Sequence, residues 1–215
     1  MKILLCTATE MEIASTIQYL ASHEHQAIEV VITGVGLMTS TYAIAKAIAI
    51  HQPSLVIQAG IAGTLEADQP LGEVVVVRSE TVGDLGVQES TGFQSLFDLK
   101  LLSSDMAPWK QGKLTNENDL LATIGLKIVD GVTVNEISTN QETITYYRNQ
   151  LGAQIETMEG AGLHYVALME KLPFLQIRSV SNFIGERDKT KWEMKKSITN
   201  LNRALQQLIT KHFIA

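Results

Sequence analysis

Short apolar runs that alternate with helix-like segments constrain the fold of this chain more than any other feature. The helix-like spacing is illustrated by Leu37, Thr41, Ile44 and Ile48, which recur on one side of a 3.6-residue period. Strands that alternate with helices favour a mainly parallel sheet with helices on both faces. We therefore expect residues 1–215 to form a single domain, a three-layer α/β/α fold around a central mixed, mainly parallel sheet.

The predicted elements follow this alternation along the chain. Strands are expected at residues 2–8, 28–33, 55–58, 73–78 and 126–134, in a short run that ends near 157, and at 174–181. Helices are expected at residues 10–20, after 36, and at 141–150, 160–171 and 190–212. Residues 83–118 lack clear periodicity and are predicted to be mostly loop with short helical pieces. Because functional sites in such sheets collect at the carboxyl ends of strands, the polar residues there are the candidates for function.

Composition excludes several classes of partner. The net charge of −6 disfavours nucleic-acid polymers, which are bound through clustered Lys and Arg. The only cysteine, Cys6, lies in an apolar run, so we interpret it as a small buried hydrophobe. No disulfide can form within the chain, and no segment is long and apolar enough to span a membrane, so a cytoplasmic location is expected.

The strongest candidate for a binding residue is Glu159. It opens a predicted helix and is followed by the small residues Gly160, Ala161 and Gly162, which permit a ligand to approach closely. A carboxylate accepts two hydrogen bonds at once, which suits the vicinal hydroxyls of a ribose. The alternative is a carboxylate that is merely stabilised by the helix dipole, and we favour the binding role over it.

Two further sets of polar residues lie near predicted strand and helix ends. Strand alternation is expected to put Arg178 and Asn182 on one face, and an arginine in an apolar strand needs a carboxylate partner such as Glu12 or Glu159. The alternative for this face is ordinary exposure to solvent. Glu10 and Glu12 lie about 200° apart on a helix, so only one of them can face a cleft as a general base.

Two glycine-rich stretches are predicted to be turns at strand ends. Gly34-Val35-Gly36 begins like a dinucleotide-binding fingerprint but lacks its third small residue, and Gln58 stands where an acidic residue would contact a ribose. Residues 60–63 are predicted to form a second turn. Two such turns would let the backbone approach a ligand, although simple turn chemistry also explains them.

Metal binding and aromatic stacking receive little support. His23-Glu24-His25 and His164 lack the spacing of metal ligands. Trp192 is expected on the terminal helix as a core residue, in preference to a platform on which a ligand stacks.

With these residues in view, the chain resembles the nucleoside phosphorylase and nucleosidase superfamily over nearly its whole length. The resemblance is carried by the N-terminal strand up to Glu12, by Gly34-Val35-Gly36, Gln58-Ala59-Gly60-Ile61-Ala62-Gly63, Met158-Glu159 and Arg178 to Asn182. Within the superfamily, the futalosine hydrolase branch of menaquinone biosynthesis is the most similar. That likeness rests on residues 81–86, on Gly131-Val132-Thr133-Val134-Asn135 and on residues 181–192.

The resemblance implies roles for individual residues. Glu12 matches the carboxylate that activates water, Met158 and Glu159 match the pair that holds the ribose, and Arg178 matches an arginine near water and sugar. Asn182 stands where adenine-specific nucleosidases carry Asp, and an amide can donate to N7 or O6 of a 6-oxopurine. The remaining residues expected at the substrate are Gly60, Ile61, Asn135 and Phe93, the last of which would reach a neighbouring subunit's site.

The expected activity is hydrolysis of the N-glycosidic bond of futalosine, which releases hypoxanthine. The resemblance implies no cofactor, no metal and a homodimer or larger homo-oligomer. Three alternatives remain: a methylthioadenosine/adenosylhomocysteine nucleosidase, a purine nucleoside phosphorylase, and a non-enzymatic dinucleotide-binding module. Asn182 disfavours the first, the absence of an arginine after residues 34–36 disfavours the second, and the missing acidic residue at Gln58 disfavours the third.

Overall fold

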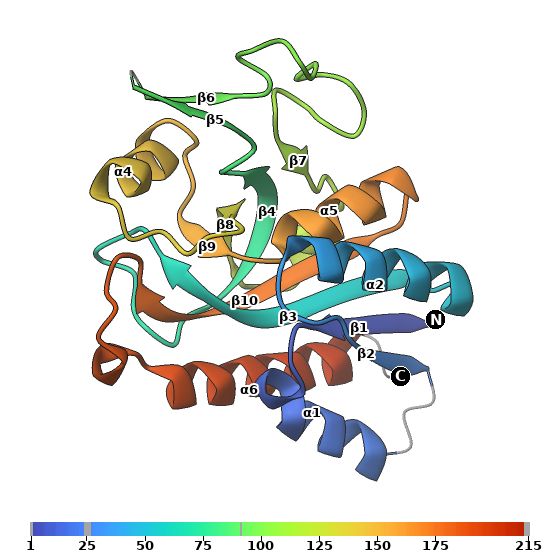
Figure 1. The fold of residues 1–215 in the computed structure, drawn as a ribbon. Helices are drawn as coiled ribbons and strands as arrows, with labels where there is room; N and C mark the ends of the chain where they lie inside the picture. The colour runs from blue at the N-terminus through green and yellow to red at the C-terminus, as the bar shows by residue number, and fades with distance from the viewer. Residues whose placement is uncertain (1, 24–26, 91, 213–215) are drawn as a thin grey trace.

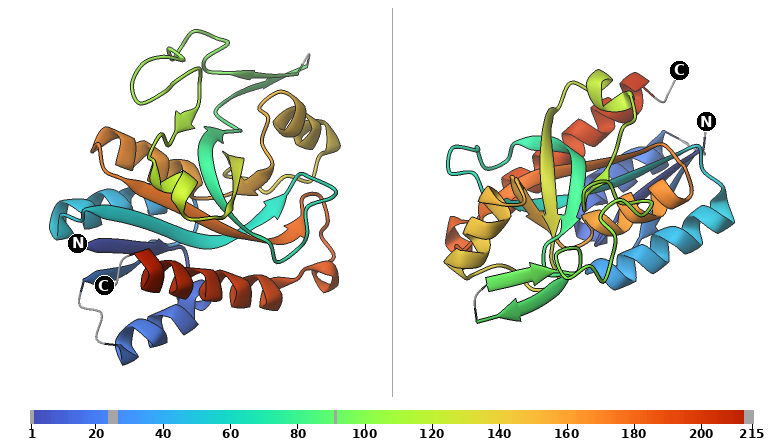
Figure 2. Two further views of the ribbon diagram at one scale, coloured as in Figure 1. Left: turned by 180° about the vertical axis from the view of Figure 1, so that it is seen from behind. Right: turned by 90° about the horizontal axis from the view of Figure 1, so that it is seen from above.

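The fold is a mixed sheet with two helices on each side, as a computed structural model shows for residues 2–23, 27–90 and 92–212 (Figure 1). Helices α1 and α6 cover one face, and α2 and α5 cover the other (Figures 1 and 2). The strands are β1 (Ile3–Thr7), β2 (Ile28–Ile32), β3 (Leu55–Thr64), β4 (Val74–Val82), β5 (Gly86–Glu89), β6 (Gly92–Ser95), β7 (Leu114–Thr115), β8 (Lys127–Thr133), β9 (Ile155–Thr157) and β10 (Phe174–Phe183). The helices are α1 (Glu10–Ser22), α2 (Leu37–His51), α3 (Leu120–Thr123), α4 (Gln141–Asn149), α5 (Gly160–Met169), the 3₁₀ helix η1 (Lys189–Lys191) and α6 (Met194–His212). The predicted α/β architecture is thus confirmed.

The strand order is β10-β4-β8-β9-β3-β1-β2, with β7 on the edge of β4. Strand β10 also pairs with β3, so that five strands close on themselves while β1 and β2 extend the sheet beyond this closed part. The β1–β2, β1–β3, β3–β10, β4–β8 and β8–β9 pairs are parallel, and β3–β9 and β4–β10 are antiparallel. Closure brings the ends of β3, β9 and β10, far apart in sequence, to one place.

Packing on both faces explains why the apolar runs form buried strands. Helix α6 presents Leu201, Leu205, Leu208 and Ile209 to the sheet, a spacing that keeps one side of the helix apolar. On the opposite face, α2 packs beside α5, with Ile44 among its buried residues. Cys6 is fully buried in this second layer, as its sequence context predicts, and burial raises the pKa of its thiol to about 12.

The predicted turn at residues 60–63 is wrong, because these residues continue strand β3 to Thr64. Within the strand, the lack of a side chain at Gly60 allows close approach of a neighbouring residue. A Cβ on Gly60 would lie 2.4 Å from Nη1 of Arg178, so the missing side chain makes room for the guanidinium. Pairing with distant strands therefore keeps these residues extended, although their local sequence favours a turn.

Three other predictions need correction. Residues 83–118 contain the β5–β6 hairpin and the short β7 in addition to loop. The terminal helix starts at Met194, since the Asp188 side chain accepts a hydrogen bond from the Thr190 N–H and caps a separate turn. A bulge between Val180 and Asn182 sets Asn182 opposite Gly63, so strand alternation does not continue from Arg178 to Asn182.

Candidate active site

A cavity of about 270 Å³ lies at the ends of β1, β3, β9 and β10, where the predicted site residues were expected. Five of those residues line it: Glu12, Ile61, Met158, Glu159 and Asn182. Residues without a predicted role complete the wall, among them Thr9, Met11, Val35, Ile137, Glu156, Ser181, Ile184 and Trp192. The cavity thus combines a mostly apolar wall with a few polar groups, as sites for small molecules commonly do.

Glu12 reaches this cavity from the first turn of α1, with only 6% of its surface exposed. Its Oε2 accepts hydrogen bonds from the Thr9 N–H at 3.0 Å and the Thr9 hydroxyl at 3.0 Å. The Ile61 N–H donates to Oε1 at 3.1 Å. These bonds cap the helix and also hold the carboxylate in one orientation. Glu10, by contrast, is exposed, so the structure selects Glu12 from the pair.

Glu159 is the N-cap residue of α5 and is likewise 6% exposed. Its Oε1 accepts a hydrogen bond from the Gly36 N–H at 3.1 Å, and its Oε2 lies 3.6 Å from Nη1 of Arg178. Gly36 has a positive φ of 98°, which favours glycine and brings its N–H toward the carboxylate. The Gly34–Gly36 turn therefore holds Glu159 in place. Because the Gly36 N–H donates to Glu159, it is not free to donate to a phosphate.

Arg178 is the partner of Glu159, as the sequence suggested, but it does not line the cavity. The guanidinium is 1% exposed and also donates from Nη2 to Oε1 of Gln58 at 2.8 Å. Gln58 in turn donates to the Glu159 carbonyl at 3.4 Å. Arg178 thus lies behind the cavity wall and orients Glu159, which differs from the direct place beside water and sugar implied by the resemblance.

Another buried carboxylate, Glu80, supports the start of α5 from behind. It accepts hydrogen bonds from Gln176 Nε2 at 2.7 Å and from the Thr133 hydroxyl at 2.9 Å. The Thr133 hydroxyl oxygen accepts the Ala161 N–H at 2.8 Å, which links Glu80 to the start of α5. Complete burial raises the pKa of Glu80 to about 7. The sequence offered no signal for this role, since Glu80 lies in an ordinary strand run.

Asn182 lines the cavity at the end of β10. Its Oδ1 accepts a hydrogen bond from the Ser181 hydroxyl at 2.8 Å, and its Nδ2 donates to the Phe183 carbonyl at 3.2 Å. The amide nitrogen carries two protons, so one N–H remains for a ligand. The position fits the predicted contact with a base.

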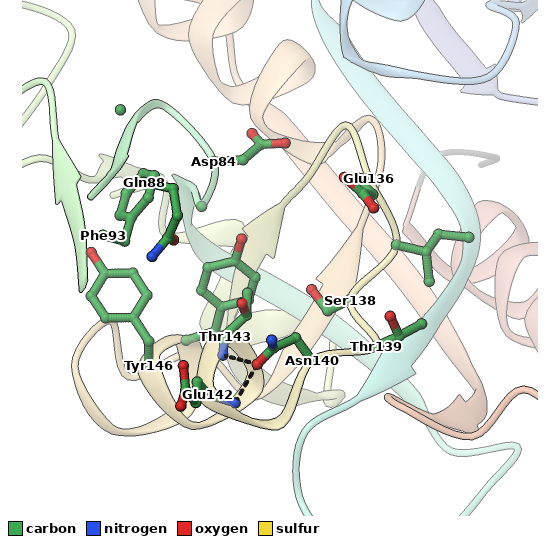
Figure 3. A pocket seen from close by; sticks show the side chains of 14 residues that line it. Asp84, Gln88, Phe93, Glu136, Ser138, Thr139, Asn140, Glu142, Thr143 and Tyr146 are labelled. Carbon is green, nitrogen blue, oxygen red and sulfur yellow. Dashed lines mark hydrogen bonds between the residues drawn. The ribbon is translucent and has the colours of Figure 1, made fainter. Parts of the chain in front are cut away.

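The other predicted substrate residues lie elsewhere. Gly60 is covered by Arg178 and Glu12, and Asn135 binds Asp84 through its N–H at 2.7 Å and its side chain at 3.1 Å. Phe93 lies in a second cavity of about 600 Å³, where its ring is 5.6 Å from that of Tyr146 (Figure 3). None of the three lines the Glu159 cavity.

Sequence reasoning missed or misjudged other parts of the wall. Trp192 follows η1 instead of lying in α6 and is only partly buried, so it is a cavity residue and not the core residue we expected. Ile137 lines both cavities. The sequence signal for this role of Trp192 was a tryptophan close to a loop that contains glycine. The sequence alone does not show that this loop borders a cavity.

Neither metal ligands nor a membrane segment is found in the part of the chain that the structure describes. Among residues 2–23, 27–90 and 92–212, no three His, Cys, Asp or Glu side chains are grouped as metal ligands. Glu24 and His25, considered in the sequence, lie outside these residues. None of the described helices has both the length and the apolar character needed to cross a bilayer.

Known proteins match this chain over most of its length. The family model of the phosphorylase superfamily matches residues 7–215. A futalosine hydrolase of Thermus thermophilus is 31% identical over 180 residues, covering 82% of this chain and 79% of the relative. One from Acidothermus cellulolyticus is 31% identical over 185 residues, covering 84% and 74%.

Solved structures share the fold. A futalosine hydrolase mutant of Helicobacter pylori superposes with a TM-score of 0.83 at 18% identity, over 98% of this chain and 99% of the other. The 5′-methylthioadenosine/S-adenosylhomocysteine nucleosidase of the same organism gives 0.82 at 17% identity, over 98% of both chains. Structural likeness alone does not separate these two enzymes, whereas the sequence relatives do. The chain belongs to the phosphorylase superfamily and, within it, to the family of the futalosine hydrolases.

Proposed function

We propose that this protein hydrolyses the N-glycosidic bond of futalosine and releases hypoxanthine. The observation that carries the proposal is the placement of Glu12, Glu159 and Asn182 around one cavity, in a chain whose sequence relatives are futalosine hydrolases. The three groups are a carboxylate for water, a carboxylate for a sugar diol and an amide for a base. No metal or cofactor enters the proposed reaction.

Each residue takes one part of the reaction. Glu159 accepts hydrogen bonds from the ribose hydroxyls, and Arg178 and Gly36 hold its carboxylate in place. Glu12 takes a proton from the attacking water, an action that typically contributes about 10²–10⁴-fold to rate. Asn182 donates to the departing purine as negative charge develops on it. The sugar passes through a transition state of oxocarbenium character, as in sugar hydrolysis generally.

Two rival activities fit the site less well. A phosphorylase needs a cation for phosphate, and Arg178, which lies behind the cavity wall, is paired with Glu159 and Gln58. An adenine-releasing nucleosidase is disfavoured by Asn182. The Gly36 N–H, which a dinucleotide phosphate would need, donates instead to Glu159.

The decisive experiment incubates the protein with futalosine, inosine and methylthioadenosine, each with and without phosphate, and identifies the products by chromatography. We expect hypoxanthine from futalosine at a rate that phosphate does not change. Release of adenine from methylthioadenosine as the faster reaction would assign the adenine-releasing nucleosidase. A ribose 1-phosphate product that requires phosphate would assign the phosphorylase.

We also propose a homodimer, formed through the neighbouring helices α2 and α5. Met38 and Tyr42 of α2 are 82% and 68% exposed, and Met169 of α5 is 52% exposed, which is unusual for large apolar side chains. Val35, two residues before the start of α2, lines the cavity, so this face borders the site. Light scattering of the wild type and of Met38→Asp tests the proposal, with a monomeric variant as the expected result. The single cysteine fits a reducing compartment, and we propose the cytoplasm.

A further inference from the structure

Glu80 is linked to the start of helix α5 through two threonine hydroxyls. The Gly160 N–H donates to the Thr157 hydroxyl oxygen at 3.2 Å. The Ala161 N–H donates to the Thr133 hydroxyl oxygen at 2.8 Å. Both hydroxyls in turn donate to Glu80, at 3.4 Å from Thr157 and 2.9 Å from Thr133. Because the first N–H groups of a helix have no partner within the helix, the groups that bind them fix where it starts. Glu80 therefore positions the end of α5 that bears the carboxylate proposed to hold the ribose.

On its other side, Glu80 contacts two buried polar side chains in series, Gln176 and His164. Nε2 of Gln176 lies 2.7 Å from Oε1 of Glu80. His164 interacts with the Gln176 side chain, and its Nδ1 lies 2.9 Å from the Leu114 carbonyl oxygen. A carbonyl only accepts hydrogen bonds, so Nδ1 carries a proton. Complete burial and the charge of Arg178 lower the pKa of His164 to about 4, so the ring is neutral and its Nε2 is an acceptor.

With Nε2 of Gln176 on Glu80, two acceptors are left facing each other. Oε1 of Gln176 and Nε2 of His164 are both buried, and neither has a hydrogen-bond partner among the described residues. Such a pair is costly inside a protein. A half-turn of the Gln176 amide exchanges its oxygen and nitrogen within the same volume and gives Nε2 of His164 a donor. The amide oxygen then lies against Oε1 of Glu80, and two oxygens at hydrogen-bonding distance need a proton between them.

That proton is more stable on Glu80 than on His164. On Nε2 of His164 it would create a buried cation and leave a buried anion, whereas on Glu80 it keeps all three side chains neutral. Complete burial raises the pKa of Glu80 to about 7, opposed by its hydrogen bonds and by the charge of Arg178. Among the described residues, the groups that act on Glu80 from β8 and β9 are neutral hydroxyls, and Arg178 of β10 is charged.

We propose that Glu80 is a positioning residue that acts as a neutral acid. Its carboxyl group donates to Gln176, and the Gln176 amide donates to His164. The charge of Arg178 is thereby left to Glu159. This inference rests on the proposed function, because Glu159 is the carboxylate assigned to the ribose. An ionised Glu80 would lose its hydrogen bond to Gln176 and would compete with Glu159 for Arg178. Ribose binding should therefore weaken when Glu80 loses its proton.

The first test detects the proton itself by infrared spectroscopy. A protonated carboxyl group has a C=O stretch that lies apart from the amide and carboxylate bands and shifts in D₂O. At about pH 6 the wild type should show such a band, which Glu80→Gln lacks and which fades as the pH rises through about 7. Glu156, whose pKa is also raised by burial, is present in both proteins and does not contribute to the difference. A wild type without this band overturns the inference, and that measurement needs neither a substrate nor a variant that folds.

The second test measures KM for futalosine as a function of pH. Glu80→Ala removes both donor and acceptor and should raise KM about tenfold at about pH 6, the usual cost of buried groups left unpaired. Glu80→Gln keeps a donor and an acceptor, as the neutral acid does, and should recover most of that loss. In the wild type, KM should rise above about pH 7 by at most about tenfold per pH unit, the limit for one ionising group. Glu80→Gln cannot ionise and should lack this rise.

Glu170→Gln is the matched control, because Glu170 is exposed at the other end of α5. It should keep both the infrared band and the wild-type dependence of KM on pH. A Glu80→Gln protein whose KM rises with pH as in the wild type overturns the inference. So does a Glu80→Gln protein that is as impaired at about pH 6 as Glu80→Ala, since that result would mean that an ionised carboxylate is required.

The two proposals can fail separately. A protein that hydrolyses futalosine but shows no protonated carboxyl band contradicts only the role of Glu80. A protein that shows the band, and loses it in Glu80→Gln, yet does not hydrolyse futalosine keeps Glu80 as a neutral acid and contradicts the proposed function.

Discussion

Arg178 and Glu159 form an ion pair inside the protein: Nη1 of Arg178 lies 3.6 Å from Oε2 of Glu159, and their side chains are 1% and 8% exposed. Gln58 accepts a further hydrogen bond from the guanidinium at 2.8 Å. Both charges are removed from water, so each depends on the other far more than the partners of a surface pair do. The carboxylate proposed to hold the ribose is therefore oriented by the core of the sheet.

Arg178→Met should lower the free energy of unfolding by about 3–5 kcal/mol, because it leaves a buried carboxylate without its cation. Urea unfolding measures the loss. Arg78→Met is the control, since Arg78 pairs with Asp130 at 2.6 Å but is 54% exposed, and its removal should cost no more than about 1 kcal/mol. Equal losses in the two variants would show that burial does not strengthen the Arg178 pair.

Glu159→Gln should weaken both substrate binding and turnover, since a charged acceptor of two hydrogen bonds becomes a neutral amide. The variant should also discriminate less against a 2′-deoxy substrate than the wild type does. The measurement is the ratio of kcat/KM for the ribo and 2′-deoxy nucleosides in each protein. If the ratio is the same in both, Glu159 does not contact the diol.

Glu12→Gln should retain substrate binding and lose about 10²–10⁴-fold in kcat, because the amide keeps the shape of the carboxylate but cannot take a proton. Single-turnover rates with saturating futalosine measure the loss, and circular dichroism checks that the variant is folded. Glu10→Gln is the control on the same helix and should turn over normally, because Glu10 is exposed. A near-normal rate in Glu12→Gln would assign water activation to another group.

Asn182→Asp should shift base preference away from hypoxanthine. An ionised Asp cannot donate to the purine, and an unpaired buried acceptor costs about 1–3 kcal/mol, or about one to two decades in rate. The relevant quantity is the kcat/KM ratio for futalosine and its adenine analogue in wild type and variant. An unchanged ratio would remove Asn182 from base recognition.

Glu80→Gln should change how stability depends on pH. The pKa of Glu80 rises from 4.5 to about 7 on burial, so between these values the folded state binds more protons than the unfolded state. Stability from this group is then present at low pH and falls as the pH rises toward 7. Gln cannot ionise, so the unfolding free energy of the variant minus that of the wild type should increase by about 3 kcal/mol across this window.

Urea unfolding at several pH values from about 4.5 to 8 measures this difference. His164 contributes the opposite slope, because burial lowers its pKa to about 4, but it is present in both proteins and cancels. A difference that stays constant with pH would mean that folding does not raise the pKa of Glu80.

Local sequence patterns were sufficient for most elements. The spacing of Leu37, Thr41, Ile44 and Ile48 predicted a helix after Gly36, and α2 is that helix, with Ile44 and Ile48 buried. The 200° between Glu10 and Glu12 predicted that at most one of them faces inward, and only Glu12 is buried. These predictions succeed because helical and strand periods are properties of consecutive residues.

Local patterns of the same kind gave wrong predictions where pairing with distant strands determines the backbone conformation. Gly60 to Gly63 read as a turn, yet pairing with β10 and β9 keeps them in β3. The bulge before Asn182 is a shift in register between β10 and β3. The alternation of residues within β10 therefore does not predict which residue of β3 lies opposite Asn182.

The sequence by itself determined the fold class, the buried strands and the carboxylates worth attention, because each depends on the order of neighbouring residues and on which side chains avoid water. Only the tertiary structure decided how those groups are used. It placed Arg178 behind Glu159, Phe93 in a second cavity, and Glu156 and Asn182 on the two strands that flank Gly63. These relations depend on sheet register and closure, which are fixed by contacts between segments far apart in the chain, and such contacts leave no periodic trace within any one segment.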